Sequence, residues 1–192
     1  MRLCVFCGSS TGLDPAFASA ARTLATGLAA RGIEVVYGGG NVGLMGIVAD
    51  AALAAGGRVI GVIPHALVTR ELAHQGLSEI HVVDSMHERK ALMSSLSDGF
   101  IALPGGFGTL EEFCEAVTWT QLGVHAKPCG LLNVAGFYDG LLAFLEHALE
   151  EEFLRPTHRE IVVSDADPIR LIDRLIAWQP PLIAKWIEKT ET

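Results

Sequence analysis

Short apolar runs alternate along the chain with longer stretches in which apolar residues recur at helical spacing. The short runs have the length of strands, which we expect at residues 2–6, 33–37, 58–63, 79–83, 99–103, 128–134 and 161–163. Helices are expected between them, at residues 15–31, 43–55, 86–97, 109–122, 138–152 and from 168 onward. This alternation predicts the α/β class, with an open parallel sheet covered by helices on both faces. We expect one domain over residues 1–179 and a tail over residues 180–192.

Local signals set several of these helix ends. Asp14 and Asp167 each precede a proline, and Asp suits the N-cap while Pro suits the first helical position. Gly32 is placed to end the first helix. Ser85 and Glu88 have the spacing of a capping box, which predicts that a helix begins there.

Composition excludes several classes of protein. The chain has 192 residues, half of them hydrophobic, and a formal net charge of −8. So many apolar residues exclude a disordered chain, and the acidic balance argues against a nucleic-acid-coating protein. The amino terminus resembles no export signal, and no run reaches the ~20 apolar residues of a membrane span. We therefore expect a cytoplasmic protein without nucleic-acid or membrane partners, with its four cysteines reduced.

Cys4 and Cys7 form a CxxC pair, which can indicate redox chemistry. That chemistry favours a pair at a helix N-terminus, where the thiol pKa is lowered. Here Cys4 falls inside an expected strand, so ordinary packing is the preferred interpretation.

Small residues follow three of the expected strands, at positions 7–10, 38–40 and 104–106. The carboxyl ends of parallel strands share one edge of the sheet, where open α/β proteins bind ligands. Loops without bulky side chains let backbone amides approach an anion there. The glycines at 38–43 also match GxGxxG, but they follow the second strand and lack the acidic residue of a dinucleotide site. A tight turn near a sugar or phosphate is therefore favoured over NAD or FAD.

The segment PGGFGTLEE at residues 104–112 carries the strongest signal. Its glycines, the Thr109 hydroxyl and the free amides of the following helix suit a phosphate, although the P-loop lysine is missing. Thr109 and Glu112 have capping-box spacing, so Glu112 is interpreted either as a cap or as a catalytic carboxylate. Glu115 and Thr118 share the helix face of Glu112, where Glu115 is either solvated or part of a carboxylate pair.

Residues 86–90 (MHERK) open a helix at the same edge of the sheet. A charged first turn is commonly a solvated surface, yet Arg89 could bind a phosphate or sugar with its forked donors, and Lys90 could add a charge. The seven histidines show no metal-ligand spacing, so neither a metal nor another cofactor is expected.

Together these segments resemble the LONELY GUY family. The resemblance rests on VFCGSS at 5–10, GGGNVGLMG at 38–46, MHERK at 86–90, PGGFGTLEE at 104–112 and VTWTQLGVHAKPCGLLN at 117–133. Members are cytokinin riboside 5′-monophosphate phosphoribohydrolases that were once labelled lysine decarboxylases. The resemblance implies a Rossmann-like catalytic domain, a nucleoside 5′-monophosphate substrate and a homodimer.

The resemblance implies that Arg89 and Glu112 are the catalytic pair. Taken with the loop motifs, it also gives the residues expected to bind substrate: Gly8, Ser9, Gly40, Glu71, Met86, Lys90, Gly105, Gly106, Phe107, Gly108, Thr109, Leu110, Glu111, Glu115 and Thr118.

The expected reaction is hydrolysis of the N-glycosidic bond of an N6-modified adenosine 5′-monophosphate. Bond cleavage builds positive charge on the sugar, which a carboxylate such as Glu112 stabilises. Three alternatives remain open at this point: an AMP nucleosidase of broader specificity, a nucleotide-binding module without catalysis, and a pyridoxal-phosphate decarboxylase, which would require a Schiff-base lysine.

Overall fold

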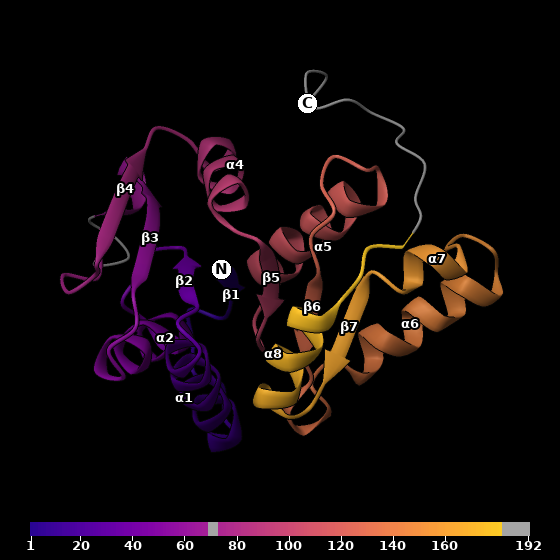
Figure 1. Ribbon diagram of the computed structural model, residues 1–192, viewed down its shortest axis with the longest axis horizontal. Coiled ribbons are helices and arrows are strands. Elements are labelled where there is room, and N and C mark those ends of the chain that lie inside the picture. The colour runs from indigo at the N-terminus through magenta and orange to yellow at the C-terminus, as the bar shows by residue number, and fades with distance from the viewer. Residues whose placement is uncertain (69–72, 182–192) are drawn as a thin grey trace.

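The fold is a seven-stranded parallel sheet (Figure 1). The computed structural model describes residues 1–68 and 73–181. The strand order is β4-β3-β2-β1-β5-β6-β7, and every pair is parallel. The strands are β1 (Arg2–Phe6), β2 (Glu34–Tyr37), β3 (Val59–Pro64), β4 (Glu79–Val83), β5 (Gly99–Ala102), β6 (Cys129–Leu132) and β7 (Val162–Asp165). The order reverses between β1 and β5, so the carboxyl ends of these strands mark the switch point where ligands of such sheets bind.

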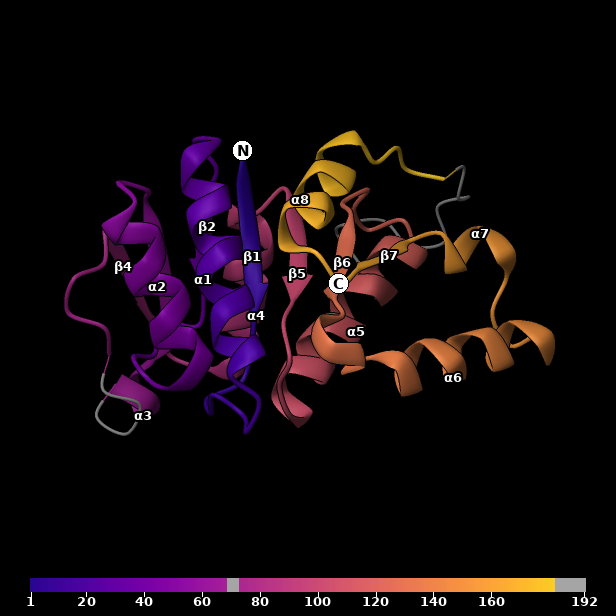
Figure 2. The same cartoon turned by 90° about the horizontal axis from the view of Figure 1, so that it is seen from below.

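Helices cover both faces of the sheet (Figures 1 and 2). They are α1 (Pro15–Ala30), α2 (Gly43–Ala54), α3 (His65–Val68), α4 (Met86–Leu96), α5 (Phe107–Gln121), the 3₁₀ turn η1 (Val134–Gly136), α6 (Asp139–Glu150), α7 (Pro156–Arg159) and α8 (Pro168–Ala177). The first core cluster lies between the sheet and α1, α2 and α8, and the second lies under α4 and α5. Successive residues of β1 enter opposite clusters, because side chains alternate along a strand. The predicted two-faced α/β architecture is confirmed.

Most of the predicted capping residues make the expected contacts at the ends of their helices. The Asp14 carboxylate accepts a hydrogen bond from the amide of Ala16 (2.8 Å), and Asp167 caps α8 in the same way. Gly32 follows α1 with a φ of 65°, a left-handed value that glycine adopts without strain. The Ser85 hydroxyl accepts from the Glu88 amide at 3.1 Å, but Glu88 accepts from the Asp84 amide and not from Ser85.

Three expectations on element bounds need correction. The strand predicted at 128–134 ends at Leu132, because the chain turns into η1. The last strand runs to Asp165, two residues beyond the prediction, and the short helix α7 was not predicted. Helix α5 begins at Phe107, two residues earlier than expected, because Gly106 and not Thr109 or its neighbour is the N-cap residue.

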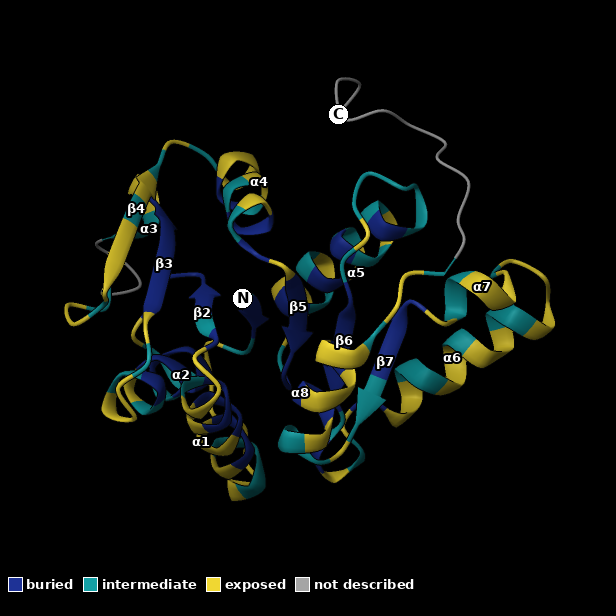
Figure 3. Ribbon diagram, viewed as in Figure 1, coloured by how far each residue is buried: buried dark blue, intermediate teal, exposed yellow. Residues whose placement is uncertain are grey.

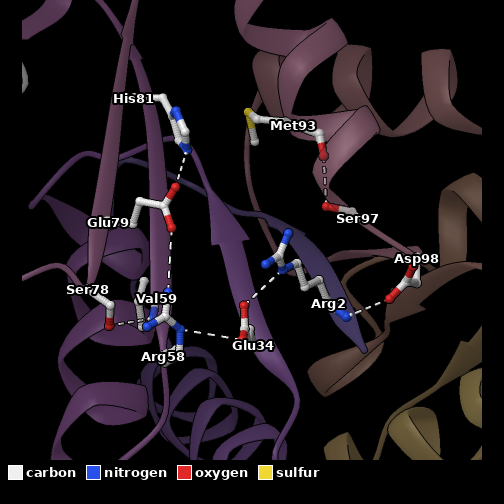
Figure 4. A network of polar contacts seen from close by, with 10 residues as sticks. All are labelled: Arg2, Glu34, Arg58, Val59, Ser78, Glu79, His81, Met93, Ser97 and Asp98. Atoms are coloured by element: carbon white, nitrogen blue, oxygen red, sulfur yellow. Dashed lines mark hydrogen bonds and ion pairs between the residues drawn. The ribbon is translucent and has the colours of Figure 1, made fainter.

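A network of charged side chains joins the amino ends of β1 to β4 (Figure 4). Arg2 Nε lies 2.8 Å from Glu34 Oε2, and Arg58 contacts both Glu34 and Glu79. These groups are partly exposed, so each pair contributes little stability by itself. The network occupies the sheet edge opposite the glycine-rich loops and leaves the carboxyl edge to the site.

Burial separates the central strands from the edge (Figure 3). Strands β3 and β5 are buried throughout, whereas β4 at the edge exposes Ile80 and Val82. Trp178 packs against the first core cluster. Glu71, Trp186 and all but the first two residues of the expected tail lie outside the described residues.

Candidate functional site

Glycine-rich loops meet at the switch point between β1 and β5. The amide of Gly8 donates to the carbonyl of Pro104 (3.0 Å), and the Gly8 carbonyl accepts from the amide of Leu44 at the start of α2 (3.0 Å). A cavity of about 310 Å³ opens between these loops. It is lined by Gly8, Ser9, Ser10, Thr11, Gly12, Phe17, Leu44, Pro104, Gly105, Gly106 and Phe137.

The first turn of α5 faces open space beside this cavity. A Cβ built on Gly106 or Gly108 would meet no atom within 4 Å. At Gly105 a Cβ would lie 2.2 Å from Thr109 Oγ1, so the loop can pack this closely only with glycine. The turn therefore offers free helix amides and a partial positive charge where an anion can reach them.

The predicted capping box of Thr109 and Glu112 is wrong. Helix α5 has Gly106 as its N-cap, without a side-chain cap, and Thr109 is its third helical residue. In a capping box the third helical residue is the acid, and in α5 this position is occupied by the buried Thr109. Glu112 therefore does not form a capping box with Thr109. Of the two interpretations of Glu112, the one as a helix cap is therefore wrong.

Glu112 instead faces Arg89 across the gap between α5 and α4. Glu112 Oε1 lies 3.7 Å from Arg89 Nη1, and only 12% and 9% of these side chains are exposed. Arg89 Nε donates to the carbonyl of Val62 at 3.2 Å, which fixes the guanidinium over the end of β3. The alternative of a solvated Arg89 is therefore wrong.

Gly38 makes room for the guanidinium. A Cβ at Gly38 would lie 1.9 Å from Arg89 Nη2, which is inside van der Waals contact. Gly38 was not among the expected site residues. Its signal was the run of three glycines at 38–40, which was interpreted as a turn near a sugar or phosphate and not as the seat of an arginine.

Lys90 makes a second connection between α4 and α5. Its Nζ donates to Glu111 Oε1 at 2.5 Å and to Glu115 Oε1 at 3.0 Å. Burial lowers the pKa of Lys90, but the hydrogen bonds and charges of the two carboxylates outweigh burial and raise the pKa above its usual value. Lys90 is therefore charged, and Glu115 is part of an ion pair and not a solvated residue.

Two thiols lie close to Glu112. Cys4 and Cys7 are both free, and burial raises the pKa of each, with a further increase from the negative charge of Glu112. Redox cysteines require the opposite shift. The interpretation of the CxxC pair as packing is thus favoured.

The remaining residues that we expected to bind substrate differ in how far they are exposed to solvent. Gly40 is buried and forms an isolated bridge with Ala73. Met86 and Phe107 are both exposed, Phe107 to 93%, and the Met86 sulfur lies 3.8 Å from Arg89 Nη1. Leu110 packs against the second core cluster. Thr118 is exposed, and its hydroxyl donates to the Cys114 carbonyl.

Two further cavities lie along α5. A small one of about 10 Å³ touches Glu112 and is lined by Phe6, Lys90, Ser94, Phe100, Glu112, Glu115, Ala116 and Trp119. The second is a groove of about 420 Å³ between α4 and α5. Trp119 lies in the segment that carries the family resemblance, but it was not among the expected site residues.

A search of residues 1–68 and 73–181 finds no group of three or more His, Cys, Asp or Glu side chains placed to hold a metal ion. In the same residues, no helix has the length and apolar character needed to cross a membrane.

Comparison with known proteins gives a consistent result. A family model described as "Possible lysine decarboxylase" matches residues 45–175. The chain is 51% identical over 179 residues to the probable cytokinin riboside 5′-monophosphate phosphoribohydrolase LOGL6 of Oryza sativa subsp. japonica, covering 93% of this chain and 72% of that protein. It is also 51% identical to the cytokinin riboside 5′-monophosphate phosphoribohydrolase LOG3 of Arabidopsis thaliana, covering 93% and 83% of the two chains.

A solved structure shares the fold at much lower identity. The molybdenum cofactor carrier protein of Chlamydomonas reinhardtii superposes with a TM-score of 0.69 at 20% identity, covering 92% of this chain and 98% of that one. The topology is therefore common to proteins whose sequences have diverged widely.

Proposed function

The chain belongs to the LONELY GUY family of cytokinin riboside 5′-monophosphate phosphoribohydrolases, and we propose that Glu112, Arg89 and the start of α5 carry out the family reaction. The protein hydrolyses the N-glycosidic bond of N6-modified adenosine 5′-monophosphates. The products are the free base and ribose 5-phosphate.

The start of α5 is proposed to anchor the 5′-phosphate. Gly106 and Gly108 leave their surroundings open, so the phosphate can approach the amides of the first turn. The partial positive charge of the helix end favours the dianion. Binding energy from this remote group then helps to hold the ribose in the reacting position.

Glu112 is proposed to act on the sugar. Cleavage of the glycosidic bond leaves positive charge on the anomeric carbon, and an ionised carboxylate beside that carbon stabilises the charge and orients the attacking water. Glu112 lies one turn further along α5 than the phosphate anchor, which suits the short distance between a 5′-phosphate and C1′ of one ribose. Arg89 Nη1 places a positive charge 3.7 Å from the Glu112 carboxylate.

The observation that carries this proposal is the enclosed Arg89–Glu112 pair. Arginine side chains are rarely buried unless they are paired. Here a buried arginine and its carboxylate partner lie at the carboxyl edge of the sheet, near the switch point where ligands of such sheets bind.

The substitution Glu112→Gln tests the role of the carboxylate. We expect kcat for N6-isopentenyl-AMP to fall by about 10²–10⁴-fold, since the charge is lost while the shape is kept. Binding of the nucleotide, measured by calorimetry, should persist. The matched control is Glu150→Gln, an exposed residue of α6, which should leave both quantities unchanged. Turnover by Glu112→Gln at the wild-type rate would refute the assignment.

The same assay separates the alternatives. An AMP nucleosidase would prefer AMP when both nucleotides compete, and a binding module would release no base. A pyridoxal-phosphate decarboxylase needs an uncharged lysine for its Schiff base. Of the two lysines in the described residues, Lys90 is held charged between two carboxylates, and Lys127 donates to the Ser94 carbonyl.

We also propose a homodimer and a cytoplasmic location. The family resemblance and the exposed side chains of Phe107 and Met86 beside the site support the dimer, because a second copy would cover them. Analytical ultracentrifugation tests it, and a single monomer peak at micromolar concentration would contradict it. The four free cysteines support a reducing compartment, which cell fractionation tests.

A further inference from the structure

We propose that Tyr138 is a positioning residue for the 5′-phosphate anchor. Its hydroxyl holds the carbonyl of Leu103, the last residue before the proline and glycines that lead into α5, and Asn133 holds Tyr138 in turn. This inference rests on the proposed function. It assigns a part in substrate binding to the turn between β6 and α6, which contains none of the residues expected to bind substrate.

The contact between Tyr138 and Leu103 is enclosed. Tyr138 lies directly before α6 and is 2% exposed, and Leu103 is fully buried. The tyrosine hydroxyl donates to the Leu103 carbonyl at 2.5 Å. Burial raises the pKa of the phenol above its usual value, so the group stays protonated at neutral pH and remains a donor. Because solvent does not compete here, the hydrogen bond fixes the carbonyl firmly.

The entrance to the loop is held from both neighbours of β5 in the sheet, which are β1 and β6. At the end of β1, the Gly8 amide donates to the Pro104 carbonyl at 3.0 Å. Since a peptide group is planar, this bond also sets the direction of the Gly105 N–H. The preceding peptide has no N–H, because its nitrogen belongs to Pro104. Its carbonyl is the polar group by which that peptide can be held, and this is the group that Tyr138 binds.

The loop itself has few other means of fixing its position. A Cβ at Gly105 would lie 3.0 Å from the Gly8 nitrogen, whereas at Gly106 it would meet no atom within 4 Å. Gly106 is the N-cap of α5 and has no side chain with which to cap the helix. The amides proposed to bind the phosphate therefore depend on how the chain enters the loop, which the contacts of Leu103 and Pro104 determine.

Asn133 fixes Tyr138 through the turn that follows β6. Its Oδ1 accepts from the Tyr138 amide at 2.7 Å, and its Nδ2 donates to Asp139 Oδ1 at 2.7 Å. Inside this turn Ala135 has a φ of 50°, a left-handed value that is uncommon for a residue with a Cβ. Such strain persists where surrounding contacts hold the backbone, and it is frequent near functional sites.

The matched variants Tyr138→Phe and Tyr37→Phe test the role of the hydroxyl. Each removes one buried phenolic oxygen, and Tyr37 is the other tyrosine of the chain. The Tyr37 hydroxyl has no hydrogen-bond partner among residues 1–68 and 73–181. In Tyr138→Phe, KM for N6-isopentenyl-AMP should rise by about 3–10-fold, the effect of losing one hydrogen bond. In Tyr37→Phe it should stay at the wild-type value.

The turnover number separates a positioning role from a general loss of structure. In Tyr138→Phe, kcat should change by less than about twofold, because the loop holds the phosphate alike in the ground state and in the transition state. Calorimetry with ribose 5-phosphate examines the anchor without the base. Its Kd should rise by the same factor as KM in Tyr138→Phe and stay unchanged in Tyr37→Phe.

A second variant, Asn133→Ala, carries the test if Tyr138→Phe does not fold. It leaves the tyrosine in place but removes the oxygen that binds its amide, so KM and the Kd for ribose 5-phosphate should again rise. In the double variant the rise should be smaller than the product of the two single effects, since both act through the same contact with Leu103. A full product would contradict the part assigned to Asn133.

The outcomes distinguish this inference from the proposed function. An unchanged KM and an unchanged Kd for ribose 5-phosphate in folded Tyr138→Phe would overturn the inference, while the hydrolase would stand. An equal rise of KM in Tyr138→Phe and Tyr37→Phe would also overturn it. If the wild type releases no base from N6-isopentenyl-AMP, the proposed function fails. The inference is then judged by the Kd for ribose 5-phosphate alone.

Discussion

Arg89 Nη1 and Glu112 Oε1 face each other at 3.7 Å in a space that the backbone of Gly38 closes on the other side. The catalytic pair proposed above thus depends on a residue that has no side chain. Because a Cβ at position 38 would lie 1.9 Å from Arg89 Nη2, the arginine cannot keep its place if that residue is enlarged.

Gly38→Ala should therefore lower kcat/KM by about 100-fold through displacement of Arg89, since small misplacements in a site have effects of that size. Steady-state kinetics with N6-isopentenyl-AMP measures the change. The control is Gly140→Ala in α6, where a Cβ would meet nothing within 4 Å. Similar activity of the two variants would show that Arg89 need not occupy this position.

Gly108→Ala should move stability and affinity in opposite directions. Gly108 lies in the first turn of α5 with open space around it, so alanine should stabilise the helix by up to about 1 kcal/mol. The added methyl group would stand where the phosphate is proposed to bind, so KM for the nucleotide should rise. Thermal unfolding and kinetics measure the two effects. A stabilised variant with an unchanged KM would argue against a phosphate at this turn.

Asp165 should make stability depend on pH in the acid range. Its hydrogen bond with Arg170 is the main reason that the carboxyl pKa lies below its usual value, and the Asp167 amide and Arg174 add to the effect although burial opposes it. Because the pKa is lower in the folded state, the stabilisation is present above the unfolded pKa of about 4 and is lost as pH falls through the folded value.

Asp165→Asn should lower Tm by roughly 2–4 °C at pH 7, a shift typical of a modest loss of stability in a domain of this size. The difference from wild type should shrink as the buffer is taken to pH 3. Thermal unfolding at several pH values checks this, with Glu150→Gln as a matched loss of one exposed carboxylate. A difference that stays constant from pH 7 to pH 3 would contradict the expectation.

The four thiols should differ in reactivity. Cys114 is exposed, whereas Cys4 and Cys129 are buried, and burial raises the pKa of Cys129 to about 12. Labelling of the native protein with a maleimide at pH 7.5 should therefore modify Cys114 first, and Cys114→Ser should remove this fast reaction. Glu112→Gln should also speed the slow labelling of Cys7, because it removes a charge that raises the Cys7 pKa. Equal rates at all four thiols would contradict this view.

Local signals in the sequence were sufficient for much of the fold. Helix α1 begins at Asp14 and Pro15 and ends before Gly32. These residues act through contacts with neighbours a few positions away, so the sequence alone indicates both ends of the helix. The alternation of strands and helices gave the parallel sheet. The start of α5 was misplaced, because a chain of glycines restricts the backbone too little to indicate where helical geometry begins.

The sequence indicated which residues lie in the candidate site better than it indicated how they contact one another. The motifs brought Arg89 and Glu112 to one sheet edge, but nothing in the spacing indicated that Arg89 is buried against Gly38 and the Val62 carbonyl. That contact joins α4 to the ends of β2 and β3, and it depends on how the helix packs over the sheet. Lys90 was expected to bind substrate, and its engagement by Glu111 and Glu115 depends on the same packing.

Helix α5 carries the open first turn, Glu112 and Trp119 within a single uninterrupted run of backbone hydrogen bonds. Inserting or deleting one residue between Gly108 and Trp119 would rotate everything beyond it by about 100° and remove the carboxylate or the indole from its face. An insertion or deletion within α5 is therefore expected to abolish activity, whereas a side chain on this face can be exchanged at constant length without moving the others.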